Sequence, residues 1–183
     1  MRITEIVKQL LIINIIMFIG TTLSGNMDLV YSFLGLRFPE NNSFKFWQII
    51  THMFMHGGSM HILVNMFTLW MFGVQIERVL GSKRFLFFYI SCGLGAAIIQ
   101  LIYLYIIFYS NLEMLISSGY DSSQIFEILN QGKYNTAWAS ILGDTNLLSF
   151  MSSFNSLMVG ASGAIMGVLV AFGMFFPENK LML

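Results

Sequence analysis

The stretch that decides the fold is THMFMHGGSMHILVNMF, residues 51–67. It contains every histidine of the chain, His52, His56 and His61, followed four positions later by Asn65. A pair of glycines separates two histidines at the end of a loop from a third histidine inside an apolar run. The histidines are therefore either one metal site or separate polar groups at the entrance of a membrane span.

The spacing argues against a metal. His52 and His56 have the i, i+4 spacing of a helical metal pair, but glycines follow them at once. On a continuous helix His61 would point away from His56, and residues 41–76 contain no carboxylate. We therefore expect no metal and no other cofactor, with His52 and His56 making hydrogen bonds in a loop near the membrane interface.

The composition of the whole chain is that of a membrane protein. Of its 183 residues, 56% are hydrophobic and 10% are charged, and the mean hydropathy is +0.73. A soluble domain of this length would be less apolar. The net charge is zero, which gives no electrostatic basis for binding nucleic acid. The single cysteine, Cys92, excludes an internal disulfide, and we interpret it as a small buried hydrophobe.

Four apolar runs predict membrane-spanning helices. They lie at about residues 7–23, 59–76, 85–108 and 157–176. Each is near the length needed to cross a hydrocarbon core of about 30 Å. No A-x-A-like cleavage site follows the first run, so we interpret it as a retained span and not as a signal peptide. The predicted fold class is all-α, a polytopic helix bundle in the lipid bilayer.

The basic residues predict an orientation. Six of the nine flank span ends that can share one side of the membrane: Arg2, Lys8, Arg78, Lys83, Arg84 and Lys180. Because Lys and Arg are in excess on the cytoplasmic side, the N-terminus is predicted to be cytoplasmic. The loop 24–58 and the segment 110–156 then face the outside. We expect a multi-pass protein of the bacterial inner (plasma) membrane.

Both outside segments are predicted to be structured. Residues 24–58 are rich in aromatic side chains such as Trp47, which commonly sit at the level of the headgroups, so this loop is expected to be partly embedded. Residues 110–156 carry turn signals between short amphipathic stretches such as Ile125–Leu129. We expect short helices resting on the surface there.

His61 and Asn65 share one face of the second predicted span, because they stand at i and i+4. Polar groups at this depth usually face the bundle interior and mark a functional site. Hydrogen bonding between helices explains such a pair equally well, so the pair alone leaves both interpretations open. The middle of each span is free of charged residues, which argues against a transporter or channel.

A second motif, Gly160-Ala161-Ser162-Gly163, lies near the start of the fourth run. Small residues around Ser162 let another backbone or a substrate come close. Gly163 and Gly167 form a small-xxx-small face, and a simple packing helix is the alternative interpretation. The motif is not the G-x-S-x-G elbow of soluble hydrolases, because Ala164 occupies the place of the last glycine.

Together these residues resemble the rhomboid family of intramembrane serine proteases. The resemblance lies in His61-x-x-x-Asn65 and in Gly160-Ala161-Ser162-Gly163, each at the start of a span. It extends to His52 and His56, to the aromatic loop with Trp47, and to Glu77-Arg78 with Gly81. It implies a single rhomboid-like membrane domain over residues 1–183, with 110–156 as an insertion between the third and fourth helices.

The resemblance implies a role for each site residue. Ser162 is the implied nucleophile, and His61 and Asn65 are the implied donors to the oxyanion, with His52, His56, Gly160 and Gly163 in support. A tetrahedral oxyanion in a low-dielectric site needs such preorganised donors. The implied activity is cleavage of transmembrane protein substrates near the outer face of the bilayer through an acyl-enzyme.

The chain departs from the family in two respects. The family's general base is a histidine on the sixth core helix, whereas this chain has four predicted spans and no histidine after His61. We therefore expect the N-terminal part of a longer rhomboid, incomplete at its C-terminus and inactive alone. Gln48 follows Trp47 where the family often has an arginine, which weakens the expectation that this loop makes the usual contacts.

Three functional interpretations follow. The favoured one is an incomplete copy of an active protease. The second is a catalytically inactive rhomboid-like protein that binds transmembrane segments, which is disfavoured because Ser162, His61 and Asn65 are all present. The third uses His61 as the base, which would remove one donor from the oxyanion site.

Overall fold

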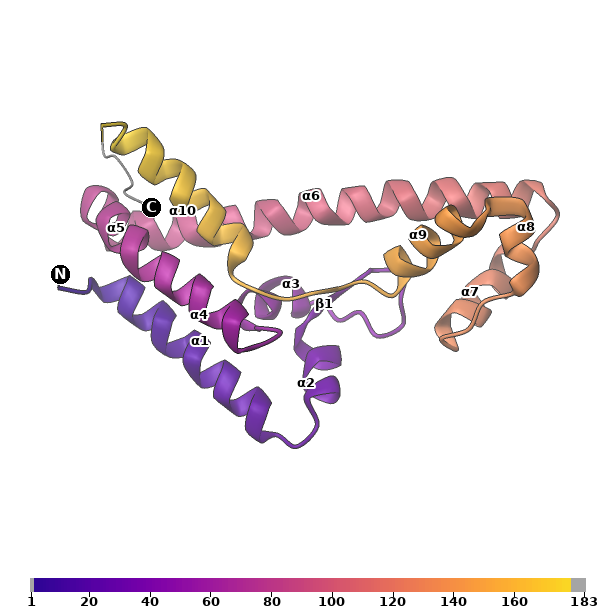
Figure 1. The fold of residues 1–183 in the computed structure, drawn as a ribbon, viewed down its shortest axis with the longest axis horizontal. Coiled ribbons are helices and arrows are strands. Elements are labelled where there is room, and N and C mark those ends of the chain that lie inside the picture. Colours follow the sequence, from indigo (N-terminus) through magenta and orange to yellow (C-terminus); the bar gives the residue numbers. More distant parts are fainter. Residues whose placement is uncertain (1, 179–183) are drawn as a thin grey trace.

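The computed structural model describes residues 2–178 as a set of helices with one short two-stranded ladder (Figure 1). Three helical stretches are long and apolar enough to cross a membrane: α1 (Glu5–Leu23), the stretch Ser59–Leu80 and α6 (Ser82–Ser117). The middle one runs without a break through α4 (Ser59–Thr68), a π-helical turn (Leu69–Gly73) and α5 (Val74–Leu80). The predicted all-α membrane fold class is confirmed.

The fourth apolar helix, α10 (Ser162–Phe175), is shorter than the predicted run 157–176. Its 14 residues extend about 21 Å, less than the hydrocarbon thickness of about 30 Å. The apolar letters before it form a strand instead: β2 (Leu157–Met158) pairs antiparallel with β1 (Leu36–Arg37). A continuous apolar run therefore contains a strand, a turn and a helix.

Helix α6 is longer than the predicted run 85–108, because it continues to Ser117. Its 36 residues extend about 54 Å, so it outreaches a bilayer core. The extension is helical because Leu104, Phe108, Leu112 and Leu115 repeat at helical spacing, and all four are buried. The first residues of the predicted insertion 110–156 therefore belong to α6.

The rest of the insertion folds as three short helices at the far end of α6 (Figure 1). They are α7 (Ser122–Asn130), α8 (Ala139–Leu142), preceded by a 3-10 turn (Thr136–Trp138), and α9 (Asp144–Phe154). Their core includes Trp138 and Phe150, which pack with Phe108 of α6 and with Phe38 from the loop 24–58. The segment 110–156 thus forms a small second cluster with the α6 extension, and its being an insertion stays a prediction.

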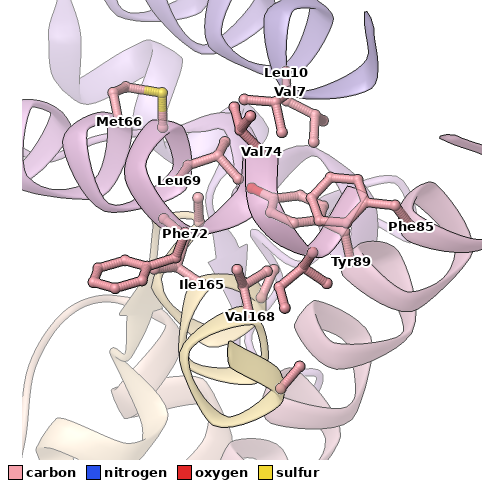
Figure 2. Close-up of a cluster of buried hydrophobic side chains, with 14 of the residues drawn as sticks. Val7, Leu10, Met66, Leu69, Phe72, Val74, Phe85, Tyr89, Ile165 and Val168 are labelled. Atoms are coloured by element: carbon pink, nitrogen blue, oxygen red, sulfur yellow. The ribbon is translucent and has the colours of Figure 1, made fainter. Parts of the chain in front are cut away.

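The main core lies where α1, the α4–α5 stretch, α6 and α10 meet (Figure 2). Its most central labelled side chains are fully buried or nearly so: Val7, Leu10, Leu69, Val74, Phe85, Tyr89, Ile165 and Val168. Because each of the four elements contributes, this core fixes the start of α10 relative to α4.

Small residues bring α10 close to α6. A methyl group on Gly163 would lie 2.6 Å from Cβ of Ala96, and one on Gly167 would meet Cys92. The predicted small-xxx-small face therefore has α6 as its neighbour, and Cys92 is half-buried against Gly167.

A buried carboxylate joins three helices at one end of the bundle. Glu77 of α5 is 2% exposed and accepts from the main-chain N–H of Ile6 (3.0 Å) and of Val7 (2.9 Å) at the start of α1. It also accepts from the hydroxyls of Thr4 and, at the start of α6, Ser82. One carboxylate thus satisfies free donors of the first turn of α1 and complements its positive dipole end.

The loop 24–58 is built around Gln48. It contains α2 (Met27–Leu34), β1, α3 (Gln48–Thr51) and a 3-10 turn (His52–Phe54). The fully buried Gln48 amide accepts from the main-chain N–H of Arg37 and Lys45, and donates to the carbonyls of Ser32 and Ser43. Gln48 therefore organises this loop, although arginine was the expected residue type. The Trp47 indole donates to the Phe33 carbonyl at 2.8 Å.

Five of the six basic residues used for the orientation lie near helix ends at one side of the bundle, where α1 and α6 start and α5 ends. Arg78 even donates to the main-chain oxygen of Arg2 at 2.9 Å. The sixth, Lys180, is outside the described residues. The cytoplasmic placement of this end stays a prediction.

Candidate functional site

Ser162 is the first residue of α10, and its side chain lines a cavity of 330 Å³. The cavity lies between α6 and the segment that leads into α10, and its walls include His52, Gly93, Gln100 and Gly160. Ser162 itself is exposed and makes no side-chain hydrogen bond with a described residue. Its hydroxyl is thus free to meet a bound molecule.

The turn before Ser162 is held from both sides. The pairing of β2 with β1 keeps residues 157–158 extended, and the main-chain N–H of Gly160 donates to the carbonyl of His52 at 2.8 Å. Gly160 has φ +121°, a region that residues with a Cβ rarely adopt. The sequence therefore needs glycine here to turn from strand to helix.

His61 packs against this glycine. A methyl group on Gly160 would lie 2.9 Å from both Cε1 and Nε2 of His61 and 3.7 Å from the Ser162 Oγ. The imidazole and the hydroxyl therefore both lie beside Gly160, where the His61 ring leaves no room for a methyl group. Nδ1 of His61 accepts from the main-chain N–H of Gly57 at 3.4 Å, so the ring hydrogen is on Nε2.

The other two histidines are buried beside this space. His52 is 5% exposed, with Nδ1 at 2.9 Å from the carbonyl oxygen of Gln48, and burial lowers its pKa. His56 is 1% exposed and stacks edge-on against His61, with ring centroids 5.1 Å apart. Burial, with a smaller contribution from the nearby His61, lowers the pKa of His56 to about 4. His56 is therefore neutral at pH 7.

Two predicted polar groups are buried without partners. Nδ2 of Asn65 and both ring nitrogens of His56 make no hydrogen bond with a described residue. Unpaired buried donors cost about 1–3 kcal/mol each, so they call for an explanation such as a bound water or a substrate group. The His56 ring does not make the hydrogen bond expected of it, and it lies buried and edge-on against His61 instead.

The structure brings some of the predicted site residues together and not others. Ser162, Gly160, Gly163 and His52 line the cavity, and His61 borders it through Gly160. Asn65 is one helical turn further along α4 and is not part of the cavity wall. Among residues 2–178, no three His, Cys, Asp or Glu side chains lie close enough to hold a metal ion.

Sequence reasoning missed Gln100. It lies on α6 within the run 85–108 and contributes to the cavity wall next to Ala96 and Ala97. The available signal was its amide, which is costly in an apolar span and marks a candidate site by default.

Part of the sequence is similar to known proteins. Residues 43–106 match the family model of the rhomboid domain, a range that contains the three histidines and Asn65 and ends before Ser162. Over 94 residues, half of this chain, the sequence is 27% identical to Rhomboid protease GluP of Bacillus subtilis (strain 168). Over 58 residues, 32% of this chain, it is 34% identical to the mitochondrial RHOMBOID-like protein 6 of Arabidopsis thaliana.

The matches are partial on both sides, since they cover 18% of the first relative and 19% of the second. The chain thus spans about a fifth of the length of the curated relatives it matches. The matched range nevertheless contains His61 on α4 and Gln100 on α6. The chain is an integral membrane protein, and residues 43–106 of it are similar to the rhomboid domain.

Proposed function

We propose that this protein is an intramembrane serine endopeptidase that cleaves transmembrane segments of other membrane proteins by acyl transfer. The observation that carries the proposal is the position of Ser162. A hydroxyl at the first turn of a helix lines a cavity, and the imidazole of His61 borders the space beside it. Acyl-transfer chemistry needs this combination of a nucleophile and a preorganised donor.

In the proposed reaction, the Ser162 Oγ attacks the carbonyl carbon of a substrate peptide. The C–O bond forms as the hydroxyl proton passes to a base, and negative charge develops on the carbonyl oxygen. Nε2 of His61 and Oγ of Ser162 both lie near Gly160, so we propose His61 as the side chain that donates to that oxygen. Collapse expels the amine, and water then hydrolyses the acyl-enzyme.

The base is a separate question. Ser162 has no hydrogen bond to any of the three histidines among the described residues, which disfavours His61 as a base. The proposal therefore assigns His61 to the oxyanion.

Asn65 is proposed as a second oxyanion donor. Its buried Nδ2 is unpaired, so it has a free N–H to offer. Asn65 stands one helical turn beyond His61 and does not line the cavity. We therefore propose that a water molecule bridges Nδ2 and the oxyanion.

The proposed substrate class follows from the shielding of peptide carbonyls in a helix. A peptide carbonyl in a transmembrane helix is hydrogen-bonded and shielded, so the helix must unwind before Ser162 can attack. Glycine and proline lower the cost of unwinding. We therefore propose substrates whose transmembrane segments carry such residues near the end that faces the side of the loop 24–58.

The proposal predicts a large effect of His61→Ala on cleavage. In the full-length gene product, cleavage of a reporter transmembrane substrate is expected to fall about 10²–10³-fold, because one preorganised oxyanion donor is lost. The rate is measured as the ratio of cleaved to intact reporter at equal expression. Unchanged cleavage would remove His61 from the oxyanion site.

Gly160→Ala is predicted to impair the same step by another route. An alanine at φ +121° costs about 1–2 kcal/mol in backbone strain, and its methyl group would push against the His61 ring. Cleavage is expected to fall at least about 10-fold, with His61 displaced. Gly173→Ala is the matched control, because nothing lies within 4 Å of a methyl group there and it also sits on α10. Equal activity of both variants would contradict the proposed role of the turn.

A catalytically inactive, segment-binding protein is the alternative function. The unpaired Asn65 and His56 also suit a site that binds without reacting. The two functions differ in one measurement, because a binding protein retains reporter binding and shows no cleavage product with or without the Ser162 hydroxyl.

A further inference from the structure

A second cavity lies at the opposite end of the bundle from the start of α4, where α1 begins and α5 ends. It is open and has a volume of 460 Å³. Its lining contains three cationic side chains and one carboxylate: Arg2, Lys8 and Arg78 with Glu5. The cavity is therefore electropositive and can attract an anion.

The anion must be recognised by side chains and not by the helix N-terminus. The N–H groups of Ile6 and Val7 already donate to Glu77, and that of Lys8 donates to the carbonyl of Thr4. Glu77 adds a second negative charge beneath the cavity, where it is 2% exposed and stabilised by four hydrogen-bond donors, so three cations face two carboxylates. The exposed cations at the rim remain in excess.

The rim is preorganised by one contact. Arg78 donates from Nη2 to the main-chain oxygen of Arg2 at 2.9 Å, which fixes the chain before α1 against α5. The rest of the guanidinium remains exposed, as do the side chains of Arg2 and Lys8. Arginine presents several donors in a planar fork, which suits the oxygens of a phosphate group.

An exposed apolar face of α1 runs away from this rim. Lys8 is followed on the same face by Ile12, Ile16 and Ile19, which are 45%, 61% and 49% exposed. In a membrane protein these side chains contact lipid acyl chains. A phosphate bound at the rim would therefore lie next to the end of α1 from which the exposed isoleucines extend.

We infer that Arg2, Lys8 and Arg78 bind the phosphate of an anionic phospholipid headgroup whose acyl chains lie along the Ile12–Ile19 face of α1. Free phosphate offers the same oxygens to these cations as a lipid headgroup does. Only the lipid also covers the isoleucines with its acyl chains. Basic pockets between transmembrane helices are suited to such headgroups. The bound lipid bridges α1 and α5 beside Glu77, so it stabilises the helix arrangement.

The test measures lipid binding to the purified full-length protein in detergent micelles by native mass spectrometry. Phosphatidylglycerol is expected to bind, and phosphatidylcholine, which carries no net charge, is expected to bind at least about 10-fold more weakly. Lys8→Gln with Arg78→Gln is expected to weaken phosphatidylglycerol binding roughly 30-fold. Equal binding of the two lipids, or no effect of the double variant, would overturn the inference.

The control removes the same number of charges at the same end of the bundle. Lys83 and Arg84 are exposed at the start of α6 but do not line the cavity, so Lys83→Gln with Arg84→Gln should change binding less than threefold. An equal loss in both double variants would mean attraction by the general surface charge and would overturn the site. Full competition by 10 mM inorganic phosphate would assign the cavity to free phosphate and overturn the lipid.

Single variants distinguish a loss of lipid binding from a loss of folding. Lys8→Gln leaves every hydrogen bond of the described residues in place, because its ammonium makes none, and should weaken binding about fivefold. Lys8→Arg keeps the charge and should retain binding. Loss of binding in Lys8→Arg equal to that in Lys8→Gln would show that the charge is not what is recognised.

Discussion

Ser162→Ala is expected to abolish cleavage of a reporter transmembrane substrate by the full-length gene product, with a loss of roughly 10⁴-fold or more. The substitution removes the proposed nucleophile and changes nothing that holds the fold, because the Ser162 hydroxyl makes no hydrogen bond with a described residue. The backbone of α10 and the packing of Ala164 and Ile165 remain. Cleavage is followed by the appearance of the shortened reporter fragment over time.

The matched control is Ser152→Ala. Ser152 is exposed on α9, far along the chain from the cavity wall, and it should leave cleavage unchanged. The melting temperature in micelles should be the same for both variants. Residual cleavage above about 1% in Ser162→Ala would assign the nucleophile elsewhere.

Comparison of the wild-type protein with Ser162→Ala also distinguishes a protease from a binding protein. If the wild-type protein binds the reporter and yields no fragment, Ser162→Ala leaves its behaviour unchanged and the segment-binding function stands. A His61 base predicts another pattern, because His61→Ala would then reduce cleavage as far as Ser162→Ala does. If His61 is an oxyanion donor, the loss of cleavage in His61→Ala is expected to be at least about 10-fold smaller than the loss in Ser162→Ala.

Much of the fold follows from apolar periodicity, because burial and lipid contact both select apolar side chains over long stretches. The helices containing His61 and Ser162 were predicted, and Ser162 was expected at a helix start. The start of α10 differs from the predicted run because Leu157 and Met158 are apolar in a strand as in a helix. Periodicity alone does not distinguish the two over so few residues.

The contacts between distant segments could not be predicted. The pairing of β1 with β2 joins residue 36 to residue 158, and Phe38 enters the core of the insertion. Neither leaves a local signal, since the partners are far apart in the chain. Gln48 illustrates the same limit, because an amide replaces the expected arginine and still satisfies four main-chain groups.

For the candidate site, the residue types were informative and their mutual geometry was not. The i, i+4 spacing places His61 and Asn65 on one face, but the structure shows that only His61 reaches the turn at Gly160. The role of Gly160 depends on its positive φ, which no spacing rule gives. Proposals for the nucleophile and the donors therefore rest on structure for their positions and on resemblance for their roles.

Glu77→Ala is expected to destabilise the folded protein by about 3–5 kcal/mol, the largest stability effect that we predict. The substitution leaves two main-chain N–H groups of α1 and two hydroxyls without their acceptor, and Val7 is fully buried. Each hydrogen bond to a charged group contributes about 1.5–3 kcal/mol, and part of that loss is recovered by water at the partly exposed Thr4 and Ser82. Unfolding by SDS in mixed micelles measures the change.

Two variants separate the hydrogen bonds from general charge effects. Glu77→Gln keeps an acceptor oxygen but turns an NH₂ group toward donors, so it should lose about half as much stability as Glu77→Ala. Glu113→Ala removes an equal charge from an exposed position on α6 and should change stability by less than about 0.5 kcal/mol. If Glu77→Ala and Glu113→Ala were equally stable, the carboxylate would not join α1 to α5 and α6. The expected difference instead makes Glu77 the link through which the lipid-facing helix α1 is held to the two helices that carry His61 and the cavity wall.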